Sequence, residues 1–199
     1  LEKAKKEGST FKEVDAERDN VLNILNELVP VYKDLTAYDD SKAYMNDGGA
    51  KGKELAAKYV AAVEKFDAAY AKFNETLNKV NAEQSKKQIE KLKKDGKKGY
   101  AAAMESTLRL TTLVDNLEKA PQKADKAAVE KELSEIEALL KSINNDRGQV
   151  LADRYNSVVG DVRQVLADPS DSNLNNMIEG FNGYIDTYNS TTPDQFDAK

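Results

Sequence analysis

The side chains that most often carry enzyme chemistry are missing from this chain, which has no histidine, cysteine or tryptophan among its 199 residues. Without histidine, no side chain has an unperturbed pKa suited to proton exchange near pH 7. Without cysteine, there is no thiolate to act as a nucleophile or to bind zinc. Two serine–lysine neighbours remain, at residues 85–86 and 141–142, but adjacent residues on a helix do not face each other. We therefore expect a protein that is not an enzyme and needs no cofactor.

Three aspartates near a glycine pair are the candidates for a cation site. Asp39, Asp40 and Asp47 surround a polar break that ends in Gly48 and Gly49. Carboxylate oxygens are ligands that calcium favours, although this spacing does not match an EF-hand loop. The alternative, which we favour, is that Asp47 or Asn46 caps the following helix and the glycines form the turn.

A run of lysines is the candidate for a binding surface. Lys91, Lys93, Lys94 and Lys97 lie within residues 84–99, where basic residues outnumber acidic ones. Such a patch could bind anionic lipid or an acidic partner. It has no arginine and no interleaved aromatic residue, which argues against base stacking or bidentate phosphate recognition. We expect an exposed turn between two helices, whose lysines serve solubility more than recognition.

Tyrosine is the most abundant aromatic residue, with nine copies against five of phenylalanine. Tyr32, Tyr59, Tyr155 and Tyr188 all fall on apolar stripes, so they could line a groove between helices that binds a ligand or peptide. The alternative is that they are core residues whose hydroxyl groups reach the rim of the core.

The elements that must position these residues are helices, because apolar residues recur at steps of three and four through most of the chain. The longest stripe keeps heptad spacing for three heptads; its members are Tyr59, Val63, Phe66, Tyr70, Phe73, Leu77 and Val80. We expect Phe66, Tyr70, Phe73 and Leu77 to be buried. The fold class is all-α, predicted as an elongated, mostly antiparallel bundle of five or six helices with long coiled-coil-like helices.

Polar and proline-containing breaks give the approximate helix boundaries. The expected helices cover residues 10–38, 50–94, 98–118, 125–143, 151–167 and 169–188, and residues 144–148 either interrupt one helix or merely weaken it. Pro30 should kink or split the first helix. We expect a flexible lead at residues 1–9, a single helical-bundle domain at residues 10–190 and a disordered tail at residues 191–199.

Charge and hydropathy exclude two broad classes. The formal net charge is −5, which argues against nucleic-acid binding. No run of about 18 apolar residues is present, so the sequence predicts no membrane span.

Residues 44–55 (YMNDGGAKGKEL) and 66–73 (FDAAYAKF) carry a resemblance to a known family. Together with Tyr155-Asn156, Phe181-Asn182 and Tyr188-Asn189, they resemble the YiiG-like family of putative bacterial lipoproteins of unknown function. The resemblance covers roughly residues 12–190. It implies a location in the bacterial cell envelope, on the periplasmic or outer face, and it supplies no catalytic residues.

From these observations we expect the domain of a lipid-anchored envelope protein that binds a macromolecular partner or envelope component, of unknown identity, through a bundle face or tip. The alternative is a small-ligand or cation-binding module that uses a groove between helices. The chain begins at Leu1 rather than at methionine, so we also expect an upstream signal peptide ending in a lipid-modified cysteine. The encoded residues before Leu1 test this, and a methionine start with neither an apolar segment nor a cysteine would contradict it.

Overall fold

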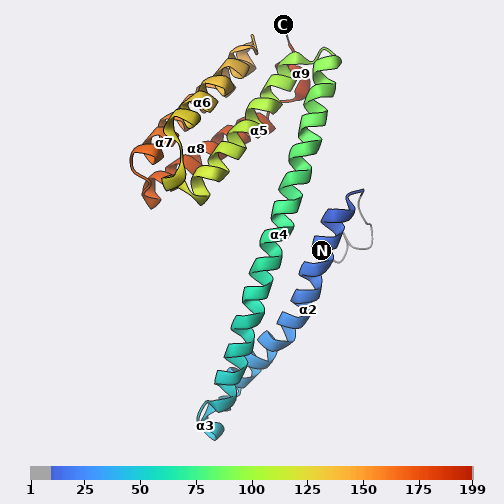
Figure 1. Cartoon of the computed structure of the whole chain (residues 1–199), viewed down its shortest axis with the longest axis vertical. Helices are drawn as coiled ribbons and strands as arrows, with labels where there is room; N and C mark the ends of the chain where they lie inside the picture. The colour runs from blue at the N-terminus through green and yellow to red at the C-terminus, as the bar shows by residue number, and fades with distance from the viewer. Residues whose placement is uncertain (1–9, 199) are drawn as a thin grey trace. The chain divides into compact units, whose positions relative to one another are not determined.

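The computed structural model describes residues 10–198, which contain helices and turns but no strand (Figure 1). The protein is 87% helical, so the all-α prediction is confirmed. The helices are α2 (Lys12–Asp40), α3 (Tyr44–Asp47), α4 (Ala50–Lys94), α5 (Lys98–Lys119), the 3₁₀ turn η1 (Pro121–Lys123), α6 (Lys126–Lys141), α7 (Asp146–Ala167), α8 (Asp171–Asn189) and α9 (Pro193–Phe196). Their number slightly exceeds the predicted five or six, because α3 and α9 are single turns too short to show a heptad pattern. The predicted flexible lead at residues 1–9 lies outside the described residues.

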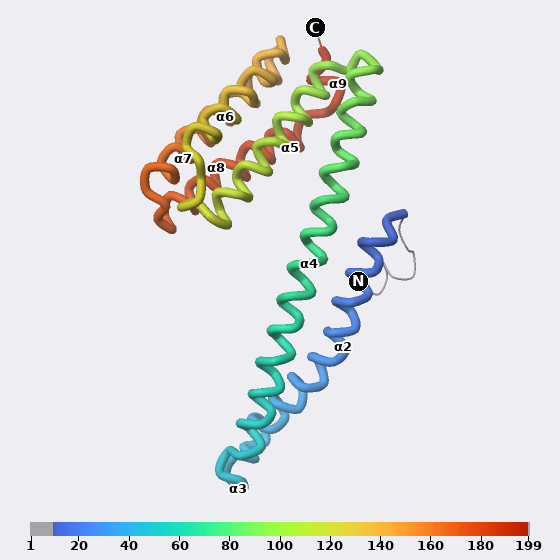
Figure 2. The backbone as a smooth tube through the Cα atoms, viewed as in Figure 1, coloured from blue at the N-terminus to red at the C-terminus, as the bar shows by residue number. Residues whose placement is uncertain are grey.

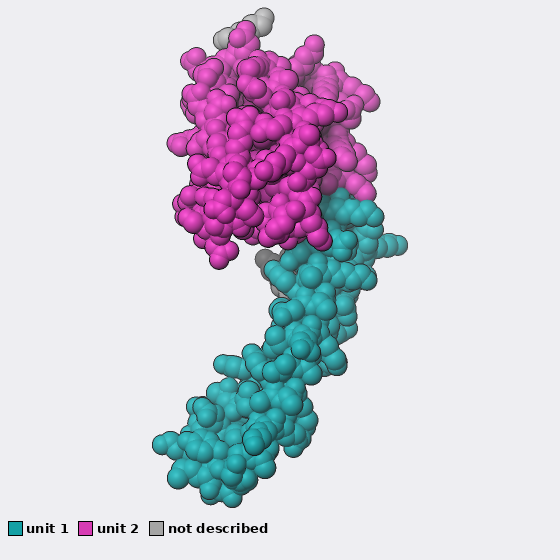
Figure 3. Space-filling view, turned by 60° about the vertical axis from the view of Figure 1, so that its left-hand side comes forward, with its two compact units in different colours: residues 1–81 teal, residues 82–199 magenta. Residues whose placement is uncertain are grey.

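The chain divides into two compact units, residues 1–81 and residues 82–199, where we had expected one domain (Figure 3). Helix α4 contributes to both units. Its later part belongs to unit 2, where Ile89 and Leu92 pack against Ala101 of α5. Heptad spacing predicted the helix α4, and the gap in its apolar stripe between Val80 and Ile89 coincides with the boundary at residues 81–82.

Unit 2 is built around the packing of α5, α6, α7 and α8. The apolar stripe of each helix faces this core, and Leu110, Ile136, Leu151, Val158 and Met177 have no exposed surface. The buried hydroxyl groups of this core are hydrogen-bonded, as burial requires. For example, the Tyr155 hydroxyl donates to the Leu133 carbonyl oxygen at 2.5 Å, and the Tyr184 and Ser106 hydroxyls lie 3.1 Å apart.

The asparagine-rich break at residues 144–148 does separate two helices. The Asn145 side chain accepts a hydrogen bond from the Gly148 amide at 2.9 Å, which caps the start of α7. Gly148 itself packs so closely on Ile143 that an added Cβ would collide with the Ile143 carbonyl oxygen. The cap from Asn145 and the close packing of Gly148 on Ile143 together explain why one helix ends and another begins here. The sequence alone had left open whether these residues interrupt the helix.

The C-terminal tail is ordered against α5, so the prediction of disorder over residues 191–199 was wrong for the described residues 191–198. Phe196 is only 2% exposed, and its ring lies 6.1 Å from that of Tyr100 and 6.0 Å from that of Tyr188. The Asp197 carboxylate accepts hydrogen bonds from the Gly99 amide at 2.7 Å and the Tyr100 amide at 3.4 Å. Helix α5 has no side-chain cap from its own N-cap residue, and Asp197 places a negative charge at its positive end.

Unit 1 is a helical hairpin, in which α2 runs antiparallel to the first part of α4 (Figure 2). Helix α2 continues through Pro30 without a split. Only Val21, Leu22, Tyr38, Leu55, Ala69 and Val80 are buried apolar residues between residues 10 and 81. The burial predicted for the α4 stripe was therefore wrong: Phe66, Phe73 and Leu77 are only partly buried, and Tyr70 is 47% exposed.

Within the described residues, no helix combines the length and apolarity that a membrane crossing needs.

The packing of the tail predicts that Phe196→Ala will destabilise unit 2. Removing a fully buried phenylalanine ring costs about 3 kcal/mol of unfolding free energy. Val150→Ala on α7, where the side chain is 45% exposed, should change the value by less than about 0.5 kcal/mol. Chemical denaturation followed by circular dichroism measures both variants. Equal stability of the two variants would show that the tail does not contribute to the core.

Candidate functional site

The turn between α2 and α4 is organised by Asp47. Its Oδ1 atom accepts hydrogen bonds from the Tyr38 hydroxyl at 2.6 Å and the Gly49 amide at 2.8 Å. Its Oδ2 atom accepts from the Lys51 amide at 3.1 Å, in the first turn of α4. Gly48 and Gly49 have φ values of +64° and +87°, which glycine adopts without a Cβ clash. The capping alternative is thus confirmed for Asp47.

The cation site suggested by Asp39, Asp40 and Asp47 does not form. Asp39 and Asp40 end α2 with exposed side chains, while both oxygens of Asp47 are engaged by protein donors. No cluster of three or more acidic side chains that could hold a metal ion occurs within residues 10–198. The hydrogen bond from Tyr38 lowers the pKa of Asp47, and the amides of Gly49 and Lys51 act in the same direction.

The four candidate lysines do not form one free surface. The Lys93 ammonium lies 2.8 Å from the Glu105 carboxylate of α5, and that of Lys97 lies 3.2 Å from Asp194 of α9. Lys91 and Lys94 are exposed and line a shallow hollow. The exposed turn predicted for residues 84–99 is confined to residues 95–97, because residues 84–94 are the end of α4 and include the buried Ile89 and Leu92. Two of the four lysines form ion pairs inside unit 2. The pKa of Lys93 is raised by its hydrogen bond to Glu105.

The four candidate tyrosines do not line one groove, because they lie in different units. In unit 2, Tyr155 is 1% exposed, and Tyr188 stacks with its ring 6.5 Å from that of Tyr100. Burial raises the pKa of both hydroxyls, as expected for core residues. In unit 1, the rings of Tyr32 and Tyr59 are 6.0 Å apart and Tyr32 is 54% exposed.

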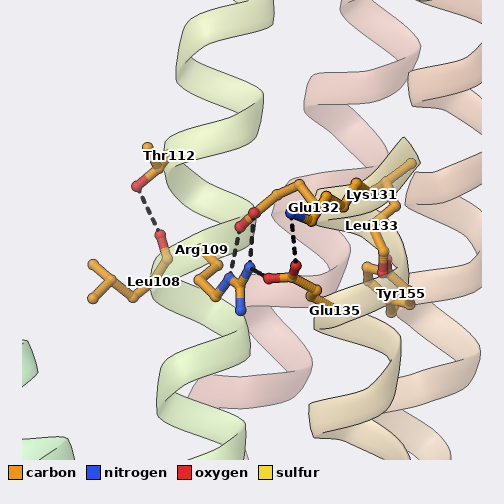
Figure 4. Close-up of polar contacts among 8 residues, drawn as sticks. All are labelled: Leu108, Arg109, Thr112, Lys131, Glu132, Leu133, Glu135 and Tyr155. Atoms are coloured by element: carbon orange, nitrogen blue, oxygen red, sulfur yellow. Dashed lines mark hydrogen bonds and ion pairs between the residues drawn. The ribbon is translucent and has the colours of Figure 1, made fainter. Parts of the chain in front are cut away.

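An open groove between α5 and α6 was not predicted from the sequence. It encloses about 550 Å³ over an apolar floor that includes Leu113, Leu117 and Val129. At one end, the Arg109 guanidinium donates to both Glu132 oxygens, at 2.6 and 2.7 Å, and also to Glu135 (Figure 4). These hydrogen bonds raise the pKa of Arg109 and lower that of Glu132. Two features of the sequence could have indicated these ion pairs: an arginine on one predicted helix, and two glutamates three residues apart on the next.

Most of the exposed large apolar side chains among the described residues lie on unit 1. We call it the hairpin face; it comprises Val29 and Tyr32 of α2 with Tyr59, Val60, Val63 and Tyr70 of α4. The exposed fractions are 44% for Val29, 54% for Tyr32, 55% for Val60 and 47% for Tyr70. Tyr59, Val63 and Tyr70 are separated by four and seven residues, so they share one side of α4. The Tyr32–Tyr59 contact joins the α2 and α4 parts of this face.

Most lysines of α4 lie on an edge away from the hairpin face, whereas Glu64 and Asp67 lie one turn after Val60 and Val63. Lysines recur every seven residues along another edge of the helix, at positions 51, 58, 65, 72 and 79. Lys72 pairs with Glu17 of α2 at 3.1 Å and Lys58 with Glu54 at 2.6 Å. A solvated helix normally carries charge all round its exposed surface. The apolar edge of α4 is therefore typical of an interaction surface.

Comparison with known proteins gives one match. The family described as "Protein of unknown function (DUF3829)" matches residues 1–150. No curated protein matches the chain, and no solved structure matches it either.

The network around Asp47 predicts a pH-dependent loss of hairpin stability. Because the folded state lowers the Asp47 pKa below its ordinary 3.8, the stabilisation is present at neutral pH and is lost as pH falls through that lowered value. Asp47→Asn should lower amide protection at Gly49 and Lys51 at pH 7. The deficit should shrink below about pH 4 and vanish once Asp47 is protonated. Asp39→Asn is the exposed control, and an equal effect of both substitutions would contradict the capping role.

Proposed function

Because the chain belongs to the DUF3829 family of proteins of unknown function, we propose its role from its surface: a non-enzymatic helical module that binds a protein partner through the hairpin face. The observation that carries this proposal is the contrast between the two units. Residues 10–81 bury six apolar side chains, whereas residues 82–198 bury 22. A face that keeps tyrosine and valine about half exposed gains further free energy when a partner covers it.

The free energy gained when a partner covers these side chains is large enough to support binding. Complete burial of a large apolar side chain is worth about 1.5–3 kcal/mol relative to exposure. Tyrosine is also enriched at protein interfaces, because its ring is apolar and its hydroxyl can bond at the rim. Tyr32 and Tyr70, each about half exposed, are the expected anchors of the contact.

The groove between α5 and α6 supports a second candidate function, the binding of a small ligand. Its volume of about 550 Å³ falls within the range typical of ligand sites. Its lining has no tyrosine, however, and its arginine is already held by two glutamates. Glu132 has a lowered pKa, which suits an ion-pair partner and not a general acid. Binding of a protein at the hairpin face is therefore the stronger proposal.

We also propose that the module works in the bacterial cell envelope as part of a lipid-anchored protein. The support is the resemblance to the YiiG-like lipoproteins in residues 44–55 and 66–73. Fractionation of cells that express the full-length gene product tests the location. Recovery in the membrane fraction, with release after mutation of an upstream cysteine, is the expected result, and recovery in the cytosol would contradict it.

The binding role is tested by photo-crosslinking in the native cell. A benzophenone amino acid in place of Tyr70 should give a discrete adduct, because this residue of the hairpin face is 47% exposed. The same amino acid in place of Lys65, on the lysine edge of α4, is the matched control and should give little adduct. Adding Val60→Lys should abolish the Tyr70 adduct. No adduct, or equal adducts from both positions, would contradict the proposal.

A further inference from the structure

We propose that residues 81–88 of α4 form a connector that unfolds locally while units 1 and 2 both stay folded. The connector is the stretch of α4 between Val80, the last buried side chain of residues 10–81, and Ile89, the first buried side chain of residues 82–198. This local unfolding is independent of the binding proposed for the hairpin face.

Within residues 10–198, the side chains of the connector form no hydrogen bond and no ion pair. Its sequence, NAEQSKKQ, contains no large apolar residue, and none of its side chains is buried. The ion pairs that tie α4 to other helices lie on either side of it, at Lys72 with Glu17 and at Lys93 with Glu105. A stretch of helix that is polar all round and lacks such pairs has little besides its backbone hydrogen bonds to keep it folded.

The buried side of α4 changes within the connector. Val80 and Ile89 are 3% and 4% exposed, and they lie nine residues apart in the sequence. This separation is about two and a half turns of an α-helix, so the two side chains lie on opposite sides of α4. The stripe that ends at Val80 would continue through Gln84 and Lys87, but both are exposed. The packing of neither unit therefore extends across the connector.

The composition of the connector makes it the part of α4 that opens most easily. Asn81 and Ser85 have lower helix propensities than alanine, because their side chains compete for backbone hydrogen bonds. Opening the connector exposes no buried side chain, whereas opening the helix on either side exposes Val80 or Ile89. Local openings of this kind need less free energy than global unfolding does.

An open connector uncouples the stability of the two units. Coupling between distant parts of a protein is carried by packed side chains, hydrogen-bond networks and rigid elements. The connector provides no packed side chain, and its helix is no longer rigid once it opens. A partner that stabilises the hairpin therefore leaves the core of α5–α8 unchanged.

Native-state hydrogen exchange of the full chain tests the local opening. The amides of residues 83–88 should exchange faster than those of residues 66–77 and 89–94 in the same helix. Asn81→Ala with Ser85→Ala should slow their exchange about fivefold, because alanine is the better helix former. Asn78→Ala, at an exposed position before the connector, is the matched control and should leave their exchange unchanged. Uniform exchange along residues 66–94, or equal slowing by the control, would overturn the proposal.

Ser85→Pro tests whether both units stay folded when the connector is open. Proline removes a helical hydrogen bond and clashes one turn back, so it forces the connector open. Exchange in α5–α8 and in residues 52–77 should change by less than about twofold. Thr76→Pro places proline in the hairpin part of α4 and should raise exchange there about tenfold or more. Loss of protection in either unit caused by Ser85→Pro would show that the connector supports the fold.

Limited proteolysis measures the same opening, because a protease cuts the transiently opened state. Among the lysines between residues 58 and 87, trypsin should cut first after Lys86 or Lys87, as the masses of the fragments will show. Asn81→Ala with Ser85→Ala should slow these cuts by the same factor as the exchange. First cuts after Lys65 or Lys72 would place the weakest part of α4 in unit 1 and would reject the connector.

Discussion

Two helices packed side by side can bury only the side chains that lie between them. This limit explains why apolar side chains are more exposed in unit 1 than in unit 2. In unit 2, α5–α8 surround a shared core, so Leu110, Val158 and Met177 lose their whole contact with solvent. Among the described residues of unit 1, α2 packs along the first part of α4. The same kind of heptad stripe that is covered in unit 2 therefore stays half exposed in unit 1. The hairpin face follows from the number of helices available to cover the stripe.

The helices themselves were predictable because their signals are local. The expected range 50–94 agrees with α4 at both ends, since Gly48-Gly49 and Asp95-Gly96 mark the turns and no proline lies between them. The capping role of Asp47 was also predictable, because its bonds reach only nearby residues in the turn. Periodicity identifies which side of a helix is apolar and which polar residues interrupt it.

The remaining features depend on contacts between distant residues. Periodicity alone does not say how many helices cover a stripe, which is why the burial expected for Tyr70 was wrong. Asp197 reaches the first turn of α5 from almost a hundred residues away, so the ordered tail leaves no local sign. The ion pairs of Lys93 and Lys97 need α5 and α9 in place. For the same reason, the sequence shows Arg109 and Glu132 on successive helices but does not show that they pair.

The central claim is that unit 1 has a much smaller core of its own than unit 2. Hydrogen exchange of the native chain tests this most directly, because it reports the stability of each helix separately. The account predicts lower amide protection in α2 and in residues 52–80 than in α5–α8, since six apolar side chains are buried between residues 10 and 81 and 22 between residues 82 and 198. Protection of α2 and residues 52–80 that equals the protection of α5–α8 would contradict this claim.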